Sequence, residues 1–229
     1  MKSVKATMLV VGLVWGWMAS GNAYAMGPKK PTPTPEPSPS PSASVTPIPV
    51  PADELKLGAI GVAGTGCVDG SAKIEVSQDK LEIRVLWDGM VAEILRDSQN
   101  SLVRKTCTIA IPVEAIAAGR TVVVSDAEVI GDYDLAAGVS AQASTEIFLA
   151  GTHGDIVKVD LGSADRVEQG KIRLAKQDAA ATACGEAGTL RANTAVLVKK
   201  DSSSQARSSG ARLQGLSLKL KVVPCAAIR

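Results

Sequence analysis

The chain has 229 residues, a formal net charge of +2 and only 3% aromatic residues. The two residues Lys2 and Lys5 lie in residues 1–25, which hold no acid, so +2 minus 2 leaves the rest of the chain neutral. A near-neutral chain with interspersed charges has no electrostatic footprint for nucleic acid. We therefore expect no nucleic-acid partner.

Residues 1–25 are typical of a secretory signal peptide. Lys2 and Lys5 precede an apolar run, Met8–Met18, and the segment ends in the small-residue pattern Ala23-Tyr24-Ala25. This order predicts export with cleavage after Ala25. The apolar run is shorter than the roughly 20 residues of a membrane-spanning helix, and no second run follows. We expect a secreted protein, extracellular, periplasmic or at the cell surface, without a transmembrane segment after cleavage.

Residues 26–52 are predicted to be a proline-rich disordered linker. Proline stands at nearly every second position in GPKKPTPTPEPSPSPSASVTPIPVP, residues 27–51. Proline removes a backbone donor and fixes φ, which disfavours both helix and sheet. An extended polyproline-II spacer of this length would be roughly 70 Å long. A solvated stalk and a wall-spanning or glycosylated stalk both remain open.

Residues 53–229 are predicted to form one all-β domain. Leu81, Ile83, Val85 and Trp87 alternate with more polar residues, and so do the apolar residues of 216–222. Alternation with period two is typical of strands with one buried face. About ten such short strands, separated by polar turns, predict an antiparallel β-sandwich. Two stretches, Val113–Ala118 and Ala179–Ala183, instead suggest a short helix.

Four cysteines follow the expected cleavage site: Cys67, Cys107, Cys184 and Cys225. An even number in an exported chain indicates disulfides. Three connectivities are possible, and we prefer Cys67–Cys107 with Cys184–Cys225. Each of these pairs closes a loop of about 40 residues, worth roughly 4 kcal/mol in the chain-entropy model. The thiols are isolated and the chain has a single histidine, His153, which disfavours a zinc site and a catalytic cysteine.

Two further groups of side chains could form sites. Asp126, Glu128, Asp132 and Asp134 could supply carboxylates to calcium, which prefers six to eight oxygen ligands, but we favour the simpler interpretation, a solvated acidic loop between two strands. His153 lies between glycines in an expected loop, but no G-x-S-x-G motif accompanies it. Trp87 falls on the same face of its predicted strand as Ile83 and Val85, so we expect it to be buried. The segment 201–210 reads as a flexible hairpin tip and a possible contact surface.

Several short motifs, taken together, are similar to one family. They are Gly64-Thr65-Gly66-Cys67, Gly70-Ser71, Leu86-Trp87-Asp88, Arg104-Lys105-Thr106-Cys107-Thr108, Phe148-Leu149-Ala150-Gly151, Cys184, Asn193-Thr194-Ala195 and Cys225. The chain resembles the secreted family catalogued as domain of unknown function 4360. It departs from the family at Val68, where proline is usual, and at the residues flanking Cys107. The resemblance implies an exported, disulfide-linked, mostly β domain, and it implies no activity or site residue.

These observations favour a non-enzymatic binding or structural module. No cluster of titratable groups suggests catalysis or a cofactor, and we expect a monomer with an unknown surface or extracellular partner. Two alternatives stay open. One is a secreted hydrolase that uses a carboxylate pair on glycans. The other is a calcium-dependent adhesin that uses the acidic residues between 126 and 134.

Overall fold

The computed structural model describes residues 55–68, 70–162, 166–201 and 207–227. The expected signal peptide and proline-rich linker, residues 1–25 and 26–52, lie outside the described residues. The described residues belong to one compact unit. The described residues contain no helix with the length and apolar character of a membrane span.

The described residues form twelve strands and one short 3-10 helix. The elements are β1 (Leu55–Leu57), β2 (Gly61–Ala63), β3 (Ala72–Val76), β4 (Glu82–Trp87), β5 (Val91–Ile94), β6 (Leu102–Ile116), β7 (Arg120–Leu135), β8 (Val139–Leu149), β9 (Ile156–Leu161), β10 (Glu168–Ala181), β11 (Gly188–Lys200), β12 (Ser209–Pro224) and η2 (Cys225–Ala227).

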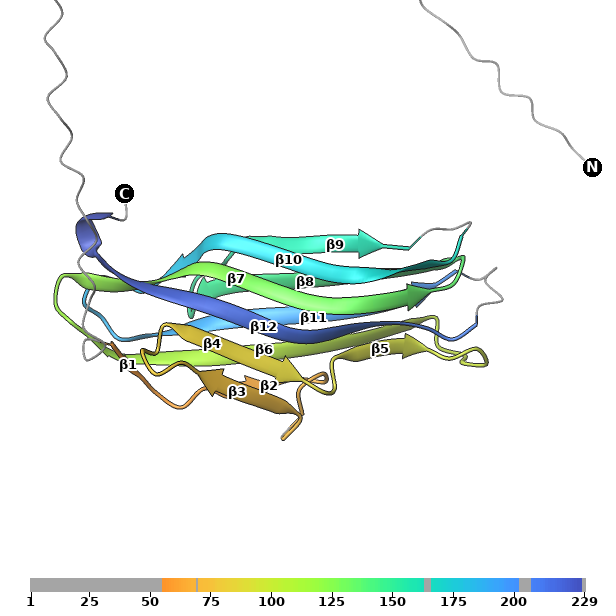
Figure 1. Cartoon of the computed structure of the whole chain (residues 1–229), viewed down its shortest axis with the longest axis horizontal. Helices are drawn as coiled ribbons and strands as arrows, with labels where there is room; N and C mark the ends of the chain where they lie inside the picture. The colour runs from red at the N-terminus through yellow and green to blue at the C-terminus, as the bar shows by residue number, and fades with distance from the viewer. Residues whose placement is uncertain (1–54, 69, 163–165, 202–206, 228–229) are drawn as a thin grey trace, which may run out of the picture. The chain divides into compact units, whose positions relative to one another are not determined.

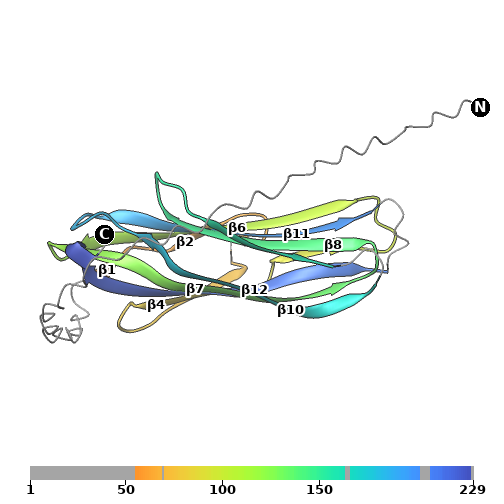
Figure 2. The same ribbon diagram turned by 90° about the horizontal axis from the view of Figure 1, so that it is seen from above.

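The strands make two six-stranded antiparallel sheets, which confirms the predicted β-sandwich (Figure 1). The order in the first, called the β6 sheet, is β1-β6-β11-β8-β9, with β2 also beside β6. The order in the second, called the β7 sheet, is β10-β7-β12-β4-β3, with β5 beside β12. Figure 2 shows the two sheets as separate layers.

Several strands are longer than the sequence pattern indicated. β7 and β12 have 16 residues each, and β6 has 15. The helices suggested at Val113–Ala118 and Ala179–Ala183 are wrong, since β6 continues to Ile116 and β10 to Ala181. Both stretches gain their backbone hydrogen bonds from neighbouring strands, which outweighs the helix preference of their alanines.

The core between the sheets is built from aliphatic side chains. Ile83, Met90, Ile109 and Leu213 are completely buried. Burial of one such side chain is worth about 1.5–3 kcal/mol. Trp87 is 4% exposed, so the prediction that it belongs to the core is confirmed.

Two disulfides tie the chain together with the preferred connectivity. Cys67 bonds to Cys107 and Cys184 bonds to Cys225, with Cα–Cα separations of 5.5 and 5.6 Å. Cys67 and Cys107 are completely buried, whereas Cys184 is exposed. Disulfides of this kind are typical of an oxidising compartment outside the cytosol.

Candidate functional site

A shallow polar hollow of about 340 Å³ lies on the β6 sheet, over strands β6, β11 and β8. We call it the β11 hollow, after the strand that runs through its middle. It is lined by Arg104, Thr106, Cys107, Thr108, Ser144, Thr145, Glu146, Ile156, Asn193, Thr194 and Ala195.

Strand register explains why the hollow lies where it does. Ala195 of β11 is opposite Thr106 of β6 on one side and Ser144 of β8 on the other. Side chains alternate between the two faces of a strand. The flanking residue Thr194 and its neighbour Cys107 are buried toward the core, so Ala195 faces outward. Its single methyl group leaves the centre of the hollow low, with the hydroxyl groups of Thr106 and Ser144 beside it.

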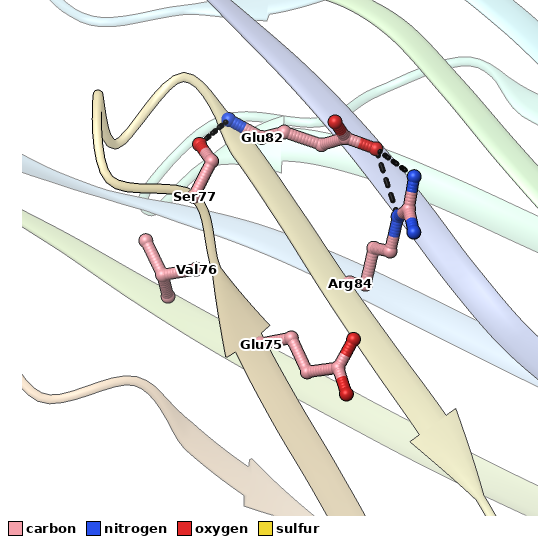
Figure 3. A pocket seen from close by; sticks show the side chains of 5 residues that line it. All are labelled: Glu75, Val76, Ser77, Glu82 and Arg84. Atoms are coloured by element: carbon pink, nitrogen blue, oxygen red, sulfur yellow. Dashed lines mark hydrogen bonds and ion pairs between the residues drawn. The ribbon is translucent and has the colours of Figure 1, made fainter.

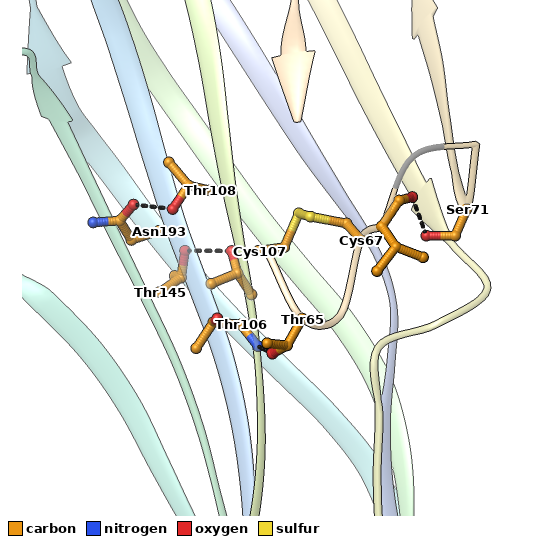
Figure 4. The surroundings of a disulfide bond; sticks show 10 residues. Thr65, Cys67, Ser71, Thr106, Cys107, Thr108, Thr145 and Asn193 are labelled. Carbon is orange, nitrogen blue, oxygen red and sulfur yellow. Dashed lines mark hydrogen bonds between the residues drawn. A yellow bond between two sulfur atoms is a disulfide. The ribbon is translucent and has the colours of Figure 1, made fainter. Parts of the chain in front are cut away.

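The next row of side chains supplies the strongest polar groups. Asn193 lies opposite both Thr108 and Glu146. The Thr108 hydroxyl donates to the Asn193 amide oxygen at 3.0 Å (Figure 4). One Glu146 oxygen accepts from the Gly154 backbone N–H at 3.2 Å. Within the described residues, the Asn193 NH2 group and the other Glu146 oxygen make no hydrogen bond, so both can meet a ligand.

The glycine-rich stretch before Cys67 supports the β6 side of the hollow. The Gly66 N–H donates to the Thr106 carbonyl at 2.9 Å, and the Thr106 N–H donates to the Thr65 hydroxyl at 3.1 Å. Gly64 has φ of 149°, and a methyl group there would collide with the Thr106 carbonyl oxygen. Glycine is therefore required for this close approach. The loop and the Cys67–Cys107 bridge hold Thr106 in place (Figure 4).

The outer face of the β6 sheet carries positive charges that have no ion pair. Within the described residues, no salt bridge involves the exposed basic residues Arg104, Lys158, Arg191 and Lys199. The same face carries two carboxylates, Glu146 and Asp160. They accept hydrogen bonds from Gly154 N–H and Gln142 Nε2, respectively, rather than from cations. Lys56 and Glu114, at the far end of β6, pair with each other and cancel. The remaining four positive and two negative side chains give this face a net charge of +2.

The outer face of the β7 sheet is arranged in the opposite way. The acidic residues predicted to lie in a loop are in fact on β7, where they alternate with the inward-facing Ala127 and Val129. The loop interpretation is therefore wrong. Each carboxylate has a basic partner on a neighbouring strand or beside it: Asp126 with Lys219, Glu128 with Arg173, Asp132 with Arg212 and Asp134 with Arg207.

These ion pairs bear on the calcium hypothesis. The basic partners come from β10, β12 and the residues just before β12, and Asp132 also accepts from Gln214 Nε2 at 2.5 Å. In the described part of the chain, no three His, Cys, Asp or Glu side chains group as metal ligands would. Calcium at Asp126, Glu128, Asp132 and Asp134 would have to displace their cationic partners.

A second hollow, of about 290 Å³, lies on the β3–β4 hairpin (Figure 3). Its two carboxylates have basic neighbours: Glu75 pairs with Lys73 at 2.6 Å, and Glu82 pairs with Arg84 at 2.7 Å. The hydrogen bond from Lys73 lowers the pKa of Glu75. A glycosidase acid needs a pKa raised above its usual range. Glu75 is therefore poorly suited to acid catalysis.

Other residues singled out by the sequence do not line the β11 hollow. His153 is exposed in the loop between β8 and β9. Residues 202–206 of the expected hairpin tip lie outside the described residues.

Sequence reasoning did not identify the β11 hollow. Thr106, Thr108 and Asn193 alternate with buried residues, and their outward position follows from that alternation. Polar residues are usual on the solvent face of a strand, so alternation alone does not mark a site. The extra signal was present in the family motifs, because residues 104–108 and 193–195 both occur among them and lie on adjacent strands.

A sequence model of the family described as domain of unknown function (DUF4360) matches residues 53–225. The chain belongs to the DUF4360 family. No curated protein is detectably similar to this DUF4360 chain in sequence.

Two solved structures resemble this DUF4360 chain distantly. TmCBM61 in complex with β-1,4-galactotriose is 13% identical with a TM-score of 0.21, and the match covers 72% of this chain and 88% of that one. The enzymatically active domain of bacteriophage CBA120 tailspike protein 4 is 8% identical with a TM-score of 0.21, over 76% of this chain and 20% of that one. At these scores neither match bears on the ligand of this chain.

Proposed function

We propose that the domain is an exported, non-enzymatic binding module, and that the β11 hollow is its ligand-binding surface. The observation that carries the proposal is the difference between the two outer faces. The β7 sheet pairs its acidic residues with basic ones from neighbouring strands. The β6 sheet leaves Arg104, the Asn193 NH2 group and one Glu146 oxygen without partners in the described residues.

The construction of the hollow also supports binding. Its polar side chains lie on three adjacent strands of one sheet rather than on loops, and the buried Cys67–Cys107 bridge lies directly behind β6. Rigid placement reduces the ordering cost that binding would otherwise incur. The motifs at 104–108 and 193–195 carry the family resemblance, and all of their residues except Lys105 line this surface.

Three carboxyl groups outside the hollow are poorly suited to acid catalysis. The pKa of Glu75, Asp79 and Asp134 is lowered in each case, chiefly by hydrogen bonds from Lys73, Ser77 and Arg207 respectively. A general acid in a carboxylate pair needs the opposite shift. The β11 hollow itself contains one carboxylate, Glu146.

The proposal is tested by filling the hollow. Ala195→Trp places an indole over the centre of the surface, and Ala175→Trp makes the same change on exposed β10 of the opposite sheet. We expect Ala195→Trp to abolish retention of the exported protein on cell-wall or extracellular glycan preparations, while Ala175→Trp binds as wild type. Equal melting temperatures would show that both variants are folded. Unchanged retention of a folded Ala195→Trp variant would refute the assignment of the surface.

A further inference from the structure

We infer that the β11 hollow takes an acidic glycan, whose sugar carboxylates are held by the unpaired cations of the β6 sheet. The inference rests on the proposed function, because it specifies the ligand of the same surface. It adds a charge requirement that a neutral-glycan surface would not have.

The first argument is the distribution of charge. Arg104 lines the hollow, and Lys158 lies opposite Ser144 at its β9 side. Neither has an ion pair within the described residues. The β7 sheet shows that this sequence can pair its charges across strands, as in Lys219 with Asp126 at 3.8 Å. Cations left unpaired around a concave polar surface attract an anionic ligand.

The second argument is the chemistry between the charges. Thr106, Thr108, Ser144 and Asn193 present hydroxyl and amide groups, which match the mixed donors and acceptors of sugar hydroxyls. The unbonded oxygen of Glu146 accepts only, so it needs a donor from the ligand. A sugar hydroxyl supplies one, whereas the phosphates of a nucleic acid would be repelled there.

The third argument is the geometry of the two charged ends. Arg104 and Glu146 lie on β6 and β8, two strands apart and at positions opposite Leu197 and Asn193 of β11. With strands about 4.8 Å apart and about 3.3 Å per residue, their Cα atoms are separated by about 16 Å. The acid group at Arg104 and the hydroxyl at Glu146 therefore belong to different sugar units of an extended chain. The planar guanidinium of Arg104 can hold a carboxylate through two parallel hydrogen bonds.

The test uses matched pairs of polymers and the full exported protein. Polygalacturonate, alginate and hyaluronate are each compared with the carboxyl-reduced form of the same backbone, by calorimetric titration at low and high salt. We expect binding to at least one acidic polymer, loss of that binding on carboxyl reduction, and weakening at high salt, because salt screens exposed charges. Stronger binding to a reduced polymer than to its acidic form would overturn the inference and leave the proposed function standing. Failure of every polymer would overturn both.

Substitutions test whether Arg104 binds the carboxylate of the ligand. Arg104→Ala should weaken binding to the acidic polymer about 10- to 100-fold, the range of a charge-assisted hydrogen bond. Arg104→Lys should recover part of it, since the charge is kept but the planar fork is lost. Arg173→Ala removes the same charge from the opposite face, where an exposed pair contributes little to folding, and should bind as wild type. Equal weakening by Arg173→Ala would show that only net charge matters and would refute a carboxylate site at Arg104.

Discussion

Thr108 and Asn193 are 85 residues apart in the sequence, and their side chains share a 3.0 Å hydrogen bond on the exposed face of the β6 sheet. The bond uses the amide oxygen of Asn193 as acceptor. It therefore fixes the amide so that its NH2 group, which donates only, is available to a ligand. One threonine thus determines the polarity that its neighbour presents.

Replacing Thr108 with valine should disturb this arrangement. The Asn193 amide would be free to rotate, and we expect ligand affinity to fall about three- to tenfold, with a loss of stability of about 0.5–1.5 kcal/mol, as for one hydrogen bond. Thr189→Val makes the same change on the adjacent strand β11, at a residue that does not line the hollow, and should leave affinity unchanged. Calorimetric titration and urea unfolding measure the two effects. Affinity that is insensitive to Thr108→Val would mean that the amide orientation is set by other contacts.

The loop before Cys67 predicts that alanine will reduce stability much more at Gly64 than at Gly61. Gly64→Ala puts a methyl group against the Thr106 carbonyl at a φ of 149°, and we expect it to cost more than about 1 kcal/mol of unfolding free energy. Gly61→Ala, three residues earlier on β2, meets nothing within 4 Å. It should be neutral or slightly stabilising. Denaturant midpoints of the two variants compare them directly, and equal midpoints would contradict the close approach at Gly64.

The two disulfides should be reduced in a defined order. Cys184 is exposed, so a thiolate can reach the Cys184–Cys225 bridge, whereas both Cys67 and Cys107 are completely buried. Because exchange requires direct attack on a sulfur atom, we expect a mild reductant to open Cys184–Cys225 first. Alkylation at timed intervals, followed by peptide mapping, gives the order. Simultaneous labelling of all four cysteines at low denaturant would indicate instead that the domain opens globally before either bridge reacts.

The Arg207–Asp134 pair predicts a specific acid response. The hydrogen bond from Arg207 lowers the pKa of Asp134 in the folded protein. A lowered folded-state pKa stabilises the fold fully above the ordinary aspartate value, about pH 4, and this contribution is lost as pH falls through the folded-state pKa. Arg207→Gln should move the Asp134 titration back toward the ordinary value. Carboxyl chemical shifts followed by NMR report it, and an unmoved midpoint would rule out Arg207 as the cause.

Local sequence patterns predicted the sandwich fold and its core better than the arrangement of charged side chains on its outer faces. Alternation placed Trp87 in the core, and loop length favoured the Cys67–Cys107 pairing, because both depend on short stretches of chain. The acidic run on β7 read as a loop, since four carboxylates and Gly131 within residues 126–134 resemble a solvated turn when the basic strands that flank them are unknown. Arg173 and Arg212 become its partners only through the strand order β10-β7-β12.

The β11 hollow could not be predicted either, because it also depends on which strands are neighbours. Each of its strands looks ordinary alone, with polar residues outside and aliphatic residues inside. Its chemistry arises where Thr108 of β6, Asn193 of β11 and Glu146 of β8 meet in one row. That row depends on the pairing of segments far apart in the chain, which alternation does not encode.

The two bridges also determine how the domain would respond to mechanical tension between its ends. Force entering at Cys67 crosses the first bridge to Cys107, and force arriving at Cys184 crosses the second to Cys225. The stretch between Cys107 and Cys184 bears the load, while the two loops closed by the bridges are shielded from direct pulling. Strand β11, with Asn193, lies in a shielded loop, and so does Arg104, so stretching the chain would not pull directly on either residue.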